Sequence, residues 1–261
     1  MEATAVQVSG PGLRARRGDR FVLGVSVVLL VVLVAAFARS FYFRAWFEDA
    51  PLSQDLVLHG TALSLWYVWL FAQSMLITTG RREWHRRMGM LGAGLALIII
   101  ATGITAVLGV VPRVMARSGT LDENMLLFAG IFWGNGGILF AFAVFVTLAL
   151  VLRRRPDAHK RLMLLASIAI APPALHRVGL LPFLRVFEPR DLNALAFMLG
   201  GLFVLLASLV IYDLKWRRRL HPVTAWSAPI FFLGFLICIF LIPPSPLGQA
   251  SAKWLVSLAT A

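Results

Sequence analysis

Charged residues are scarce in this chain, and acidic ones are the scarcest. Only 14% of the 261 residues are Asp, Glu, Lys or Arg, against about 25% in a typical soluble domain. Hydrophobic residues make up 59% of the chain, and they gather in runs long enough to cross a bilayer core, which takes roughly 20 helical residues. This composition excludes an ordinary soluble domain and predicts an all-α, polytopic membrane protein.

Cysteine and recognisable catalytic motifs are also lacking. The single cysteine, Cys238, excludes an intrachain disulfide. The sequence has no paired-carboxylate site, P-loop, HExxH zinc signature or nucleophile elbow. Because the segments between the apolar runs are too short to hold a soluble catalytic domain, any chemistry must take place in or beside the bilayer.

Basic residues outnumber acidic ones and give a net charge of +13. They lie in short clusters between apolar runs, where they orient a membrane protein and touch anionic lipid headgroups. We therefore expect membrane lipids as partners and no nucleic acid.

Seven runs are expected to cross the membrane: 21–38, 56–78, 88–111, 125–152, 162–181, 192–214 and 223–242. Basic clusters fall at the N-terminus and after the second, fourth and sixth runs, whereas the other loops balance bases with acids. The positive-inside rule then predicts a cytoplasmic N-terminus and a C-terminus outside.

The two ends of the chain are expected to be tails. Residues 1–20 are predicted to form a basic cytoplasmic tail, and 243–261 an extracytoplasmic tail with a short surface helix around 254–258. The first apolar run is also similar to a secretory signal, with an A-x-A site at 36–38. Because the run is long for a signal, we expect a retained helix.

A short histidine motif occurs twice, each time directly before an apolar run. An acid stands two residues before the histidine, a base one after it, and an arginine two after it. The first histidine motif is Glu83, His85, Arg86 and Arg87, and the second is Asp157, His159, Lys160 and Arg161. The repeat predicts that helices 2–5 form a bundle of two duplicated hairpins. In the simplest interpretation the bases are orientation signals, and Asp157 caps its helix.

The histidines are the candidate ligands. His59 and His176 are expected at similar depths near the outer face, where one haem iron, or another metal, could be held between them. His85 and His159 are a second candidate pair at the inner face. One argument against a haem at the inner pair is that both histidines lie just outside the apolar runs. In addition, the 17 residues from His159 to His176 rotate the side chain by about 100° around a straight helix, which only a kink at Pro172-Pro173 could correct.

Asn135 is the main polar residue expected near the middle of the bilayer. It requires an interhelical hydrogen bond or a cavity, and Gln73, Thr102 and Thr105 are candidate partners. We interpret it as a packing contact, with cofactor binding as the alternative. Three neighbouring aromatic residues could either line a pocket or pack between helices: Trp66, Tyr67 and Trp69.

Several of these residues together resemble a family of bacterial multi-spanning inner-membrane proteins of uncharacterised activity. The resemblance covers roughly residues 20–220 and is carried by His59-Gly60, Trp66, Gln73, Gly80, His85-Arg86-Arg87-Met88-Gly89 and Arg155-Pro156-Asp157-Ala158-His159-Lys160-Arg161-Leu162-Met163-Leu164-Leu165-Ala166. It implies a multi-pass protein of a bacterial inner membrane and implies no reaction. The histidine placement is more weakly similar to that of the di-haem transmembrane cytochromes b.

Three functional hypotheses follow. The most specific is haem b electron transfer to a quinone or small reductant, with haem propionates neutralised by Arg86, Arg87 and Arg161. The second is a non-catalytic accessory or lipid-interacting subunit of a membrane assembly. The third is a zinc-dependent membrane hydrolase, although proteins of that class carry an HxxxH pair on the last helix and the run 223–242 has no histidine.

Overall fold

The computed structural model describes residues 11–118 and 124–260, which form helices and no strand. The elements in chain order are α1 (Pro11–Phe37), the π-helical turn η1 (Ala38–Tyr42), α2 (Arg44–Phe47), α3 (Gln54–Thr78), α4 (Arg82–Leu108), α5 (Val110–Ser118), α6 (Met125–Val151), α7 (Pro156–Ala169), α8 (Pro172–Gly179), the 3-10 turn η3 (Pro182–Leu184), α9 (Arg190–Arg217), α10 (Pro222–Leu236), the π-helical turn η4 (Ile237–Leu241) and α11 (Pro246–Thr260). The all-α prediction is confirmed for this part of the chain.

Six helices of the described chain are long and apolar enough to cross a membrane, and α7 with α8 makes a seventh if the pair is one span. The axes of α7 and α8 differ by 46°. The break falls at Pro172-Pro173 because proline has no amide hydrogen to continue the helical ladder. The predicted kink is therefore confirmed, and a multi-pass membrane protein is the architecture.

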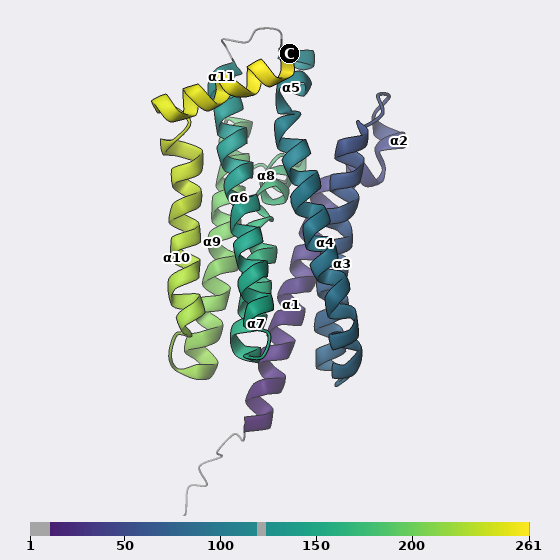
Figure 1. Cartoon of the computed structure of the whole chain (residues 1–261), viewed down its shortest axis with the longest axis vertical. Helices are drawn as coiled ribbons and strands as arrows, with labels where there is room; N and C mark the ends of the chain where they lie inside the picture. The colour runs from purple at the N-terminus through teal and green to yellow at the C-terminus, as the bar shows by residue number, and fades with distance from the viewer. Residues whose placement is uncertain (1–10, 119–123, 261) are drawn as a thin grey trace, which may run out of the picture.

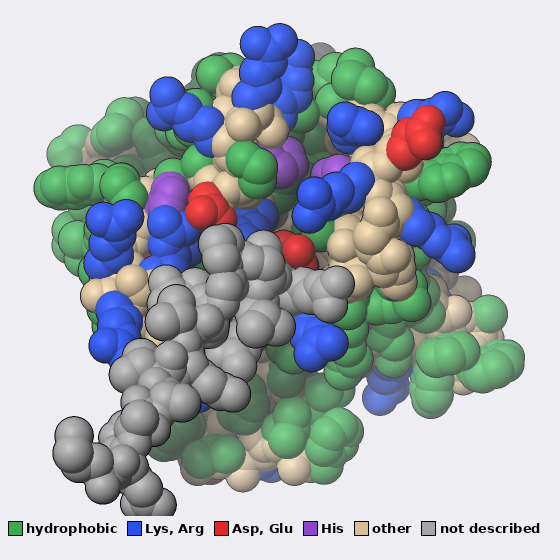
Figure 2. All heavy atoms as spheres, turned by 90° about the horizontal axis from the view of Figure 1, so that it is seen from below, with side chains coloured by type: hydrophobic (Ala, Val, Ile, Leu, Met, Phe, Trp, Pro, Cys, Tyr) green, Lys and Arg blue, Asp and Glu red, His purple; other side chains and the backbone are tan. Residues whose placement is uncertain are grey.

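The spanning helices run side by side along the long axis, and α11 lies across one end (Figure 1). The start of α1, the α3–α4 and α6–α7 turns and the α9–α10 connection all lie at the opposite end. Lys and Arg side chains are spread over that end, with histidines between them (Figure 2). We call it the basic end. Its composition agrees with the charge pattern behind the orientation prediction.

Helix α7 lies at the centre of the bundle. Every residue from 161 to 172 is buried, and α7 contacts α1, α6, α9 and α10. The surrounding helices instead expose large apolar side chains, among them Met90, Leu97 and Phe140, which are 76%, 69% and 72% exposed. In water such a surface would be unfavourable, whereas lipid tails can cover it.

Several boundaries differ from the sequence predictions. Both histidine motifs are helical, because α4 begins at Arg82 and α7 at Pro156. Residues 11–20 belong to α1, while residues 1–10 of the expected tail lie outside the described residues. The expected surface helix near the C-terminus is present as α11, where Ser251 Oγ accepts a hydrogen bond from Trp133 Nε1 of α6 at 2.9 Å.

Candidate functional site

The two motif histidines meet at the basic end. His85 and His159 are each the fourth residue of their helix, α4 and α7. Their ring centroids lie 6.4 Å apart, and the ring planes are nearly perpendicular at 81°. The structure therefore brings together the inner pair, which the sequence analysis favoured less than the outer pair.

The ring nitrogens of this pair are only partly used. His159 Nδ1 lies 2.9 Å from the main-chain oxygen of Ala149, near the end of α6. A carbonyl oxygen only accepts, so Nδ1 carries a proton, and Nε2 is the nitrogen left for another partner. Among the described residues, the buried Nδ1 of His85 has no hydrogen-bond partner. A histidine fixed at Nδ1 by a carbonyl is the usual arrangement of a metal-ligating imidazole.

Gln73 of α3 is a second buried residue with unsatisfied polar atoms. Gln73 is only 4% exposed, and within the described chain neither atom of its side-chain amide has a hydrogen-bond partner. The His85 side chain lies within reach of the main-chain carbonyl of Gln73. Leaving a buried amide unpaired costs about 1–3 kcal/mol per group. His85 Nδ1 and the Gln73 amide are thus buried polar groups that the described residues do not satisfy.

The outer histidines have different neighbours. His59 Nδ1 lies 3.1 Å from Thr102 Oγ1 of α4. His176 belongs to α8, in the electrostatic range of Arg177 and Asp191. Over residues 11–118 and 124–260, no hydrogen bond or ring contact joins the two histidines. Their joint ligation of one haem or metal stays a prediction.

The expected contacts of Asn135 are not formed. Asn135 is half-buried, and no hydrogen bond of the described chain joins it to Gln73, Thr102 or Thr105. Thr102 bonds His59 instead, and its hydroxyl donates to the main-chain oxygen of Ile98 at 2.7 Å. None of the three candidate partners is therefore bonded to Asn135 within the described residues, and its role in packing or cofactor binding stays a prediction.

The three aromatic residues of α3 serve packing. Trp66 Nε1 donates to Ser167 Oγ at 3.0 Å, and the Tyr67 hydroxyl donates to the main-chain oxygen of Ser167 at 2.9 Å. Both rings are buried, and together they fix α3 against the central helix. Trp69 Nε1 lies 3.4 Å from the Met88 oxygen, a long hydrogen bond to α4. The packing interpretation of these residues is confirmed.

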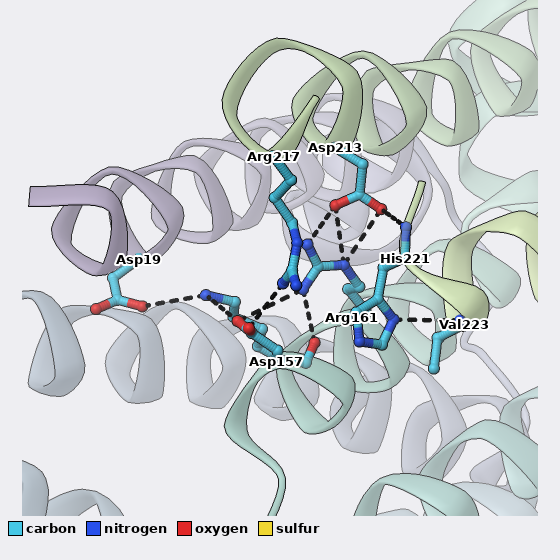
Figure 3. Close-up of polar contacts among 8 residues, drawn as sticks. Asp19, Asp157, Arg161, Asp213, Arg217, His221 and Val223 are labelled. Carbon is cyan, nitrogen blue, oxygen red and sulfur yellow. Dashed lines mark hydrogen bonds and ion pairs between the residues drawn. The ribbon is translucent and has the colours of Figure 1, made fainter. Parts of the chain in front are cut away.

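A second polar cluster lies beside the second histidine motif (Figure 3). At its centre Arg161 and Asp213 form an ion pair whose side chains are 1% and 0% exposed. Arg161 Nε donates to Asp213 Oδ1 at 3.1 Å, and Nη1 donates to the main-chain oxygen of Asp157 at 2.7 Å. The other carboxylate oxygen of Asp213 accepts the main-chain N–H of His221 at 3.0 Å. Each buried charge is thus paired and hydrogen-bonded.

The rim of this cluster is more exposed. Arg217 Nη1 donates to Asp157 Oδ2 at 2.7 Å. Lys160 Nζ lies 3.3 Å from Asp157 and 3.8 Å from Asp19 of α1. The expected helix cap by Asp157 is wrong, because the N-cap residue of α7 is Arg155 and Asp157 pairs with these cations instead. The cluster ties α1, α7 and α9 together.

His221 closes the cluster on the side of α10. Its Nδ1 accepts the main-chain N–H of Val223 at 3.2 Å and so caps α10. Burial lowers the pKa of His221, and Arg161 and Arg217 lower it further, whereas Asp213 and Asp157 act in the opposite direction. The neutral form, which the cap requires, is therefore favoured.

The sequence prediction missed Asp213 altogether. The available signal was that Asp213 is the only acid between residues 192 and 221, one turn before a basic cluster.

The sequence prediction also missed Asn193. Its Nδ2 donates to the Gly179 oxygen at 2.6 Å. Its Oδ1 accepts the main-chain N–H groups of Val186 and Phe187, each at 3.0 Å. Asn193 thereby fixes the loop between α8 and α9.

These contacts limit the expected roles of the motif arginines. Arg161 is committed to Asp213, and Arg87 to Glu83 at 2.5 Å. Arg86 is exposed, which leaves it as the arginine available to an anionic group beside the histidine pair. No group of three or more His, Cys, Asp or Glu side chains that could hold a metal ion is present among the described residues.

A scan against protein-family models, a search of the curated proteins and a search of the solved structures each gave no match.

Proposed function

We propose that this chain is a haem b electron-transfer protein of a bacterial inner membrane, with His85 and His159 as the axial ligands at the basic end. The observation that supports this proposal is the 6.4 Å separation of the two ring centroids. Metal–nitrogen bonds of about 2 Å on either side of one ion place two imidazole centroids roughly 6 Å apart.

The donor set favours haem over a hydrolytic zinc site. A catalytic zinc requires three protein ligands and an open position, whereas a haem iron needs only two because the porphyrin supplies the rest. The pair supplies two histidines, and no group of three or more His, Cys, Asp or Glu side chains that could hold a metal is present among the described residues. Haem b, when bound, supplies one-electron transfer.

The protein's own contribution is to orient the ligands. Ala149 holds the His159 ring through Nδ1, so that Nε2 is free to ligate. Arg86 is the proposed partner of a propionate. The polar group of Gln73 that faces His85 is its main-chain carbonyl. The electron partner would be a quinone or a small reductant. His59 and His176 remain the candidates for a second haem near the opposite end.

The test is the visible spectrum of the protein purified from haem-replete cells. We expect a Soret band that is lost in His85→Ala and in His159→Ala, or that falls by about half if His59 and His176 hold a second haem. His221→Ala is the matched control, because this histidine lies at the same end and outside the pair, and it should keep the band. If only His59→Ala and His176→Ala lost the colour, the haem would be assigned to the outer pair instead. A colourless wild-type protein would refute the proposal.

A non-catalytic accessory subunit is the second candidate. It is favoured by the Arg161–Asp213 cluster, in which the buried charges satisfy one another and leave none for a substrate. In that case the variants of His85 and His159 would change thermal stability, and the wild-type protein would carry no chromophore to lose.

A further inference from the structure

A groove lies on the α3–α4 hairpin at the basic end. It has a volume of about 330 Å³, and its lining residues come from the last two turns of α3, the turn and the start of α4: Ala72, Met75, Leu76, Thr79, Arg81 and Met88. This volume is near the lower limit of small-molecule sites, about 300–1,000 Å³. It is enough for a headgroup and the first part of one acyl chain.

The groove has one charged residue, at the end nearest the turn, and its other side chains are mostly apolar. Arg81 is exposed and supplies the only charge of the six. Thr79 adds little polarity, because its hydroxyl already donates to the Met75 oxygen at 2.8 Å. The nearest acid in the chain, Glu83, is paired with Arg87, so this carboxylate does not neutralise Arg81.

The place of the groove matches the depth of a lipid headgroup. α3 ends at Thr78 and α4 begins at Arg82, so Arg81 stands where two spanning helices leave the hydrocarbon. Ala72, Met75 and Leu76 lie deeper, along α3. A guanidinium pairs well with a phosphodiester, and basic clusters beside spanning helices attract anionic lipids.

We propose that this groove binds one anionic phospholipid, with its phosphodiester on Arg81 and the upper part of an acyl chain along Ala72, Met75, Leu76 and Met88. Neither His85 nor His159 lines this groove, and the proposal does not depend on haem. It differs from general attraction to a charged surface because a single arginine and an apolar wall define it.

Phosphatidylglycerol and phosphatidylcholine are the probes, titrated against the full chain in detergent micelles, with retained lipid measured by native mass spectrometry. Wild type should bind one phosphatidylglycerol preferentially. Arg81→Gln should weaken this binding at least fivefold, while Arg82→Gln, the neighbouring exposed arginine outside the groove, should change it less than twofold. Equal losses in both variants would mean diffuse attraction and would overturn the proposal.

A second variant tests the apolar wall. Ala72→Phe fills the inner part of the groove and should reduce binding of phosphatidylglycerol while leaving Arg81 in place. Free glycerol phosphate should not compete, because it lacks the acyl chain. Competition by glycerol phosphate, unchanged binding in Ala72→Phe or no preference over phosphatidylcholine would each refute a lipid site.

Discussion

The two histidine motifs have the same residue pattern but opposite surroundings. In the first, Glu83 and Arg87 pair with each other on the surface, with side chains 67% and 66% exposed. In the second, Arg161 turns inward to Asp213, and both side chains are buried. The difference arises from the neighbouring helices, since α7 lies in the centre of the bundle and faces the acid of α9, whereas α4 is peripheral. The same motif therefore serves as a surface feature in one hairpin and as a core contact in the other.

The largest effect is expected at the buried pair. Asp213→Ala leaves the buried Arg161 with only the more exposed Asp157 carboxylate, 3.7 Å away, as an anionic partner, and breaking a buried pair in this way costs about 3–5 kcal/mol of unfolding free energy. The matched change in the first motif, Glu83→Ala, removes an exposed pair worth about 0.2–1 kcal/mol. Denaturant unfolding in detergent micelles, followed by circular dichroism, measures both.

A double variant separates the charge from the packing. Arg161→Leu combined with Asp213→Leu removes both charges, and apolar replacement of a buried pair is often neutral. It should therefore recover most of the stability lost in Asp213→Ala. If Asp213→Ala and Glu83→Ala had equal effects, the contrast between the two motifs would be wrong.

The first hairpin depends on close packing instead of a buried ion pair. A Cβ at Gly92 of α4 would lie 2.1 Å from Trp69 Cζ2 of α3, so Gly92→Ala must displace the indole. We expect a loss of about 1–3 kcal/mol, typical of overpacking. Gly94→Ala is the control, because nothing lies within 4 Å of its added Cβ, and alanine favours a helix by about 0.8–1 kcal/mol over glycine. Thermal unfolding of the two variants should therefore shift in opposite directions.

The sequence was sufficient for the helices and insufficient for the contacts between them. The apolar runs predicted the spans, because the length of a run is a local property of the sequence. Pro172-Pro173 predicted the bend, because the missing proline N–H interrupts the helix at that point. The pairing of Arg161 with Asp213 joins residues 52 positions apart, and no local pattern specifies which basic residue an isolated acid will meet. The same holds for the histidines. The depth argument favoured His59 with His176, but depth alone does not determine which two rings come into contact. That depends on how the helices rotate and pack, and the rings that meet are those of His85 and His159.

A smaller difference is expected at the acids of the two motifs. Asp157 is half-exposed and pairs with Arg217 and Lys160, whereas Glu83 has only Arg87. We expect Asp157→Asn to cost about 0.5–1 kcal/mol, the upper range for solvent-screened pairs, and Glu83→Gln less than about 0.5 kcal/mol. The Asp157 effect should decrease in 1 M salt, where the screening length is about 3 Å. A loss that is independent of salt would mean that Asp157 acts through packing and not through charge.

The smallest effect concerns pH and belongs to His221, in the polar cluster around the second motif. The pKa of His221 is lowered in the folded protein, first by burial and then by Arg161 and Arg217. The unfolded chain, with a histidine pKa of about 6.5, then binds more protons than the folded one. Stability from this group is full above that value and is lost as pH falls through it toward the folded pKa. His221→Asn removes the titration but keeps an oxygen that can cap α10. The free energy of unfolding, measured from pH 8 to pH 5, should therefore decline more steeply in wild type than in His221→Asn. The two proteins share all other histidines, so parallel curves would show that the fold does not lower the pKa of His221.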